Sequence, residues 1–135
     1  MVNEMFIRFV SGEIDEDSHV AAGLFNAAFD LLDDPVFPYE DYLVLREIMD
    51  WFNEYLNGPY DYRLRAAWRA RRAICWFKPT AQAYLSRAWE MVAILERNEV
   101  FIHTIKAQRT GYVLYEDEAQ VLAEPFADIR RFCKR

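Results

Sequence analysis

A short cationic and aromatic segment is the part of this sequence best suited to chemistry. It spans residues 60–72, where arginines alternate with aromatic and small side chains. Guanidinium groups bind carboxylates and phosphates through paired hydrogen bonds, and they stack on aromatic rings. The predicted binding residues are Arg63, Arg65, Trp68, Arg69 and Arg71, with Tyr60 and Tyr62 beside them.

Charge is distributed unevenly along the chain, which gives the arginines two interpretations. Residues 1–61 contain fourteen acidic residues and two arginines, whereas residues 62–89 contain seven basic residues and no acid. The arginines therefore either neutralise the chain's own acidic surface or form an exposed patch for an anionic partner. Since the remainder is strongly acidic, it repels a long polyanion, and a nucleic acid duplex is a poor partner.

Motifs for phosphate and dinucleotide cofactors are missing from the sequence. The four glycines, at positions 12, 23, 58 and 111, stand singly, so no glycine-rich loop can wrap backbone amides around a phosphate. The serines also lack the flanking glycines of a hydrolase nucleophile turn. We therefore expect no cofactor and assign no catalytic residue.

The cysteines and histidines offer one catalytic hypothesis. Cys75 and His103 fall in neighbouring predicted strands, where a histidine could hold the cysteine as a reactive thiolate. We favour the alternative, an inert thiol buried in an apolar strand. Neither His19 nor His103 has a second ligand at zinc spacing, so no metal site is predicted.

An acidic run, Glu116 to Glu118, is followed closely by Glu124. Crowded carboxylates can hold a hard cation or act as an acid and base pair, because each raises the pKa of the other. We favour a solvated turn, whose charges keep a sheet edge from pairing with other chains.

The element that must position these groups is a central strand, Ala73–Phe77, followed by a helix. The strand is apolar throughout, as in a strand covered on both faces, which places it near the middle of a sheet. Pro79 ends the strand, Thr80 is the predicted N-cap, and Asn98 is the predicted left-handed end of the helix. The helix is predicted from apolar residues at helical spacing: Tyr84, Leu85, Ala88, Val92 and Leu95. A strand from Val100 would complete a right-handed, parallel βαβ crossover.

The first half of the chain predicts one strand and two helices. Met5–Val10 is a strand inside the sheet, ended by Ser11 and Gly12. Residues 15–18 then cap a helix that Pro35 stops. The inner residues of this helix are Val20, Ala21, Leu24, Phe25, Ala28, Leu31 and Leu32. Those of the second helix are Leu45, Ile48, Met49, Phe52 and Leu56, and they are flanked by Val44, Trp51 and Tyr55. The apolar arc of this helix is therefore unusually broad, so the helix either lies between two layers or has an exposed apolar edge.

The second half predicts three strands after the crossover helix. Val100–Lys106, Tyr112–Glu116 and Ala119–Ala123 are separated by short turns and form a meander. Phe126–Phe132 forms a short final helix. Residues 60–71 fit both a strand and a helix, and we favour an extended lead-in to the central strand.

The predicted fold class is α/β (α+β mixed), one domain spanning residues 1–135. It has a mixed sheet of about five strands and three main helices, in the order β-α-α-β-α-β-β-β, with a short C-terminal helix. A chain that is 53% hydrophobic, with few glycines and prolines, is globular. No apolar run approaches ~18 residues, so no membrane span is expected. Cys75 and Cys133 fit free thiols in a cytoplasmic protein.

Two functions from different classes follow. The first is a non-enzymatic interaction module that binds a protein partner, or a second copy of itself, through the arginine segment and the second helix. The alternative is a small enzyme or anionic-ligand-binding protein, whose pocket combines the arginines with His103 or with Glu116 to Glu118.

Overall fold

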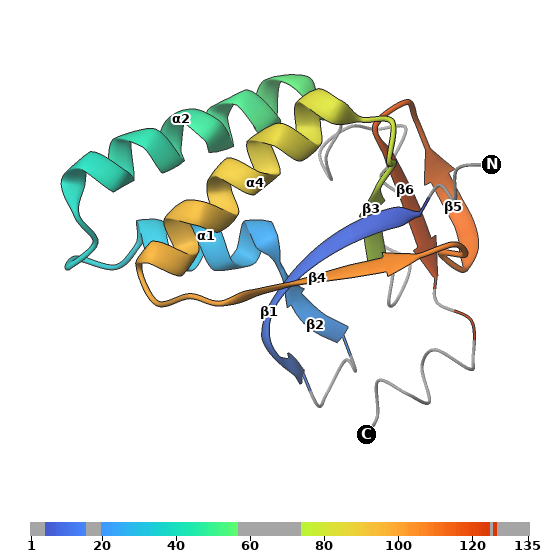
Figure 1. Cartoon of the computed structure of the whole chain (residues 1–135), viewed down its shortest axis with the longest axis horizontal. Coiled ribbons are helices and arrows are strands. Elements are labelled where there is room, and N and C mark those ends of the chain that lie inside the picture. Colours follow the sequence, from blue (N-terminus) through green and yellow to red (C-terminus); the bar gives the residue numbers. More distant parts are fainter. Residues whose placement is uncertain (1–4, 16–19, 57–73, 125, 127–135) are drawn as a thin grey trace.

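The computed structural model describes residues 5–15, 20–56, 74–124 and 126. It contains helices on one side of a sheet (Figure 1), and it confirms the α/β class with three main helices. The elements in chain order are β1 (Phe6–Asp15), β2 (Val20–Gly23), α1 (Leu24–Leu32), α2 (Tyr39–Tyr55), β3 (Ile74–Phe77), α4 (Gln82–Arg97), β4 (Ile102–Ala107), β5 (Tyr112–Glu116) and β6 (Gln120–Glu124).

β1 is the strand around which the sheet is arranged. Ile7 pairs with both Phe77 and Lys106, so β3 and β4 lie along opposite edges of β1. Val10 pairs with both Gly23 and His103, so β2 shares the edge that β3 uses. The sheet continues from β3 to β6 and then to β5. The predicted interior positions of the first strand and of the central strand are both confirmed.

The connection through α4 agrees with the predicted crossover in the direction of its two strands, but the strands are not neighbours. β3 and β4 are each antiparallel to β1, so they run in the same direction, but β1 lies between them and they do not pair. Every strand pairing in the described part of the chain is antiparallel. The predicted meander is also wrong in part, because β5 and β6 form a hairpin while β4 pairs with β1.

The first strand is longer than its sequence indicates. β1 continues past Ser11 to Asp15, with an irregularity between Ser11 and Ile14, and it pairs there with β2. Val20 and Ala21, predicted on the inner side of the first helix, therefore lie in a strand. Backbone pairing with the free edge of a long strand outweighs the helical pattern of these small residues, since short helices gain most of their stability from packing. The proposed cap at residues 16–18 lies outside the described residues.

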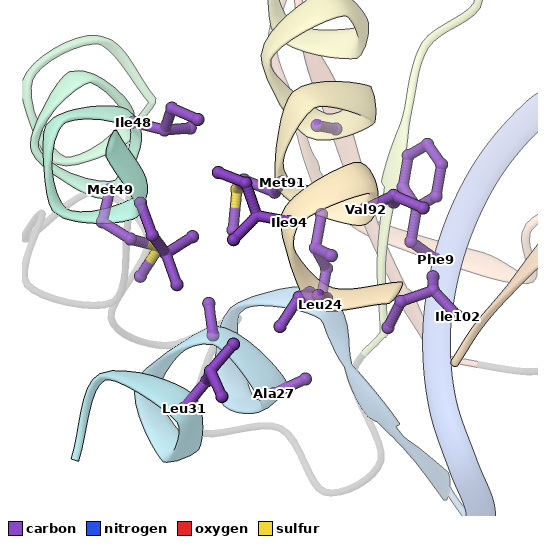
Figure 2. Close-up of a cluster of buried hydrophobic side chains, with 14 of the residues drawn as sticks. Phe9, Leu24, Ala27, Leu31, Ile48, Met49, Met91, Val92, Ile94 and Ile102 are labelled. Atoms are coloured by element: carbon purple, nitrogen blue, oxygen red, sulfur yellow. The ribbon is translucent and has the colours of Figure 1, made fainter. Parts of the chain in front are cut away.

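The helices bury their apolar sides against one another and against one face of the sheet. Figure 2 shows Leu24 and Leu31 of α1, Ile48 of α2 and Met91 of α4 converging on one cluster, with Phe9 of β1 at its side. The predicted inner residues of α2 and α4 are confirmed in this cluster or against it. Leu45, Ile48, Met91 and Leu95 are at most 1% exposed, so each contributes its full hydrophobic free energy to folding.

A polar contact joins the end of α4 to the start of α2. Arg97 Nη2 donates to Asp41 Oδ1 at 2.6 Å, and Asn98 Nδ2 donates to Asp41 Oδ2 at 3.1 Å and to the Ile94 carbonyl at 2.8 Å. The hydrogen bond from Arg97, then that from Asn98, lowers the pKa of the Asp41 carboxyl. Because the other ends of α2 and α4 also meet, where Tyr84 Oη donates to the Tyr55 carbonyl, the two helices lie antiparallel, as Figure 1 shows.

The predicted ends of α4 were wrong by one residue each. Ala81 occupies the N-cap, no side chain caps the helix, and Thr80 contributes only its carbonyl, which accepts from Gln82 N–H at 2.9 Å. At the other end Asn98 has a φ of −104°, and Glu99 takes the left-handed conformation with a φ of 66°. The Asn98 side chain instead donates hydrogen bonds to Asp41 and to the Ile94 carbonyl, so Asn98 joins α4 to α2. Among the described residues, no helix has both the length and the apolar character needed to cross a membrane.

Candidate functional site

The predicted binding residues Arg63, Arg65, Trp68, Arg69 and Arg71 lie outside the described residues, and so does the segment 60–71 as a whole. The predicted helix Phe126–Phe132 also lies outside them, apart from Phe126. The structure does describe the elements on either side of the arginine segment. α2 ends before it, with Leu56 as C-cap, and β3 begins after it at Ile74.

Of the two alternatives for the broad apolar arc of α2, the structure shows an exposed edge at Val44 and Tyr55, and it also exposes Tyr39 and Leu43, which were not predicted in the arc. Tyr39 is 70% exposed, Leu43 50%, Val44 47% and Tyr55 54%. Tyr39 and Leu43 lie one helical turn apart, so they form a continuous apolar strip. The remaining outer positions of α2 are mostly acidic, because the helix contains five acids and one arginine. Large exposed apolar side chains grouped on one helix are typical of a contact surface.

An aromatic cluster covers the C-terminal end of α2. The Trp51 ring lies 5.2 Å from each of the Tyr55 and Tyr84 rings, measured between centroids. The Arg87 guanidinium lies 5.4 Å from the Trp51 centroid, and its Nη1 is 3.3 Å from Glu90 Oε2. These contacts hold three aromatic side chains in a fixed arrangement beside the apolar arc.

A shallow hollow of about 290 Å³ opens between the end of α2, the start of α4 and the β5–β6 turn. It is lined by Tyr55, Leu56, Tyr84, Asp117, Glu118 and Ala119. Burial raises the pKa of Tyr84, and the negative charges of Glu118 and Asp117 raise it further. The charged groups known to line the hollow are carboxylates, so these described walls do not suit an anionic ligand. The sequence did not predict this hollow, because its walls come from three elements distant in the chain.

The acidic run forms a tight turn in which Asp117 has a structural role. Its Oδ1 accepts from the Ala119 and Gln120 N–H groups at 2.9 and 3.0 Å, and its Oδ2 accepts from Tyr115 Oη at 2.9 Å. Burial alone would raise the pKa of Asp117, but these hydrogen bonds outweigh it and the pKa is lowered. Glu116 pairs with Lys78 Nζ at 2.8 Å. In the described chain, no group of three or more His, Cys, Asp or Glu is placed to hold a metal ion.

The hypothesis that Cys75 and His103 form a reactive pair is wrong. Cys75 lies on β3 and His103 on β4, and β1 separates the two strands. Cys75 Sγ donates to Gln120 Oε1 at 3.1 Å. Burial raises the pKa of the thiol to about 12, the charge of Asp117 adds to this, and Arg8 opposes it. His103 is exposed on the sheet edge. The inert thiol is therefore the better interpretation of Cys75.

Comparison of the chain with protein-family models, with curated proteins and with solved structures finds no match.

The thiol of Cys75 should resist alkylation in the native protein. At a pKa of about 12 instead of 9.0, it carries roughly a thousandfold less thiolate at neutral pH. We expect a Cys133→Ser variant, in which Cys75 is the remaining cysteine, to react with a thiol reagent only in denaturant. Labelling of this variant in native buffer at the rate of a free cysteine would contradict the assignment.

Loss of the Asp117 carboxylate should destabilise the protein in a pH-dependent way. Because folding lowers the pKa of Asp117 below 3.8, the carboxylate stabilises the fold at neutral pH and loses this effect as the pH falls through the folded-state pKa. We expect Asp117→Ala to cost about 1–3 kcal/mol in urea unfolding at about pH 7, and clearly less at about pH 2.

The neighbouring exposed Glu118 provides the matched control for that experiment. Glu118→Ala should change the free energy of unfolding by less than about 0.5 kcal/mol at either pH. If the two substitutions changed the free energy of unfolding equally, the structural role assigned to Asp117 would be contradicted.

Proposed function

We propose that this chain is a non-enzymatic interaction module that binds a protein partner through the exposed side of α2 and the adjoining arginine segment. The observation that carries the proposal is the apolar strip on α2. Tyr39 and Leu43 lie together on the outer side of a helix whose inner side is fully packed, so they are not needed for the core. Such residues contribute most of their binding free energy when a partner removes them from water.

The arginine segment adds the anion-binding part of the proposal. It follows α2 directly in the chain, and its guanidinium groups suit carboxylates or phosphates on the partner. Aromatic residues and arginines are also the residue types most enriched in the centres of interfaces. The partner is therefore a protein with apolar and anionic groups side by side, or a second copy of this chain. We place this activity in the cytoplasm, on the evidence of the cysteine usage.

The alternative function, a pocket that binds a small anionic ligand, has weaker support. The hollow near α2 includes Asp117 and Glu118, but their charges repel an anion. His103 lies on β4, which does not line the hollow. An anion site would have to depend on the arginines of residues 60–72, which lie outside the described residues.

Site-specific photo-cross-linking tests the proposal. A photoreactive residue at position 43, in the strip on α2, should give one discrete adduct in the protein's native cells. The same residue at the exposed position 93 of α4 is the matched control and should not give that adduct. Adding Arg69→Gln and Arg71→Gln should weaken the position-43 adduct about tenfold or more, since each charged hydrogen bond contributes about 1.5–3 kcal/mol.

An adduct from position 43 that depends on the arginines supports a single surface made of α2 and the arginine segment. Identical adducts from positions 43 and 93, or an adduct unaffected by the arginine substitutions, would contradict the proposal.

A further inference from the structure

The outer edge of β5 has no strand partner among the described strands. β5 lies at the end of the strand order and pairs with β6, and no other described strand pairs with it. Backbone N–H and C=O groups on such an edge can form hydrogen bonds with another extended chain. Three successive apolar residues of β5 are exposed, with Tyr112 at 63%, Val113 at 54% and Leu114 at 39%.

The two ends of β5 carry opposite charges. Arg109 precedes the strand, and its guanidinium lies 4.5 Å from the Phe126 ring centroid. That ring lies 4.8 Å from the Tyr112 ring, so the cation is held beside the start of the strand. At the other end are Glu116 and Glu118, which are both exposed, and Glu116 also pairs with Lys78. A strand with this polarity complements a copy of itself running in the opposite direction.

We propose that two copies of the chain pair antiparallel through their β5 edges. A two-fold axis at Val113 would place Val113 opposite its own copy and Tyr112 opposite Leu114 of the second copy. Arg109 would then lie opposite Asp117 of the second copy. A shift of one residue in either direction brings it opposite Glu116 or Glu118, so each of these registers joins opposite charges twice.

The geometry also limits the strength and size of the assembly. The pairing between β5 and β6 shifts register between Val113 and Tyr115, which is a bulge or irregularity. Bulges bend and twist an edge strand, so only a short straight length of β5 has the geometry for regular pairing. A two-fold pair uses this edge once in each copy and closes as a dimer. We expect a weak dimer, because a five-residue strand buries less than the area of about 1,200 Å² typical of a stable interface.

Sedimentation equilibrium of the full chain over a wide concentration range tests this proposal. The average mass should rise from 16.1 kDa towards twice that value. Val113→Lys brings two lysines together on the axis and should keep the protein monomeric at every concentration. The matched control is Ile105→Lys, an exposed position on the edge strand β4, which should dimerise like the parent.

A charge exchange tests the antiparallel orientation, which places Arg109 beside the acidic run of the second copy in each of these registers, and it does not depend on the stability of the lysine variants. Arg109→Glu should weaken dimerisation about tenfold, because symmetry creates two like-charge contacts. Adding Glu118→Arg should restore most of the lost affinity. A parent chain that stays monomeric, or dimerisation lost in Ile105→Lys but not in Val113→Lys, would overturn the proposal. The β5 edge shares no residue with α2 or with the arginine segment, so either proposal can fail without the other.

Discussion

The packing of α4 is the interaction on which the rest of this structure depends. Met91 and Leu95 are completely buried, and the same side of the helix meets α1, α2 and the sheet residue Phe9. Removing either side chain would leave a cavity shared by three elements, where the cost of lost contacts is greatest. The contact of Arg97 and Asn98 with Asp41 then fixes where α2 lies along α4. The outer strip of α2 is therefore presented by a rigid support.

The same support positions the acidic turn. α4 follows β3 after a short connection, and Lys78 in that connection donates its N–H to the Ala119 carbonyl at 2.9 Å and pairs with Glu116 through its side chain. The hydrogen bonds of Asp117 hold the turn in shape, and β5 and β6 run away from it. A change at this turn would consequently reach both the hollow beside Tyr84 and the strand β5.

Much of the architecture was predictable from residue spacing, and the errors share one cause. The apolar spacing in α2 and α4 and the unbroken apolar run of β3 depend on local sequence, so they identified these elements correctly. The choice of strand partners depends on contacts between distant residues. For that reason the sequence did not indicate that β1 lies between the two parallel strands of the crossover, or that β4 pairs with β1 instead of joining the meander. The strand β2 was missed because Val20 and Ala21 also fit a helix. The hollow beside α2 was less predictable, since Tyr84 and Glu118 come together only in the folded chain.

Native-state hydrogen exchange tests the central position of α4 most directly. If α4 supports the other elements, the amides around Met91 and Leu95 exchange only through global unfolding. Their opening free energy then equals the free energy of unfolding from urea titration, and it exceeds that of the exposed edge strand β5. Exchange of these α4 amides through a local opening, while the amides of β1 and β6 remain protected, would contradict this account.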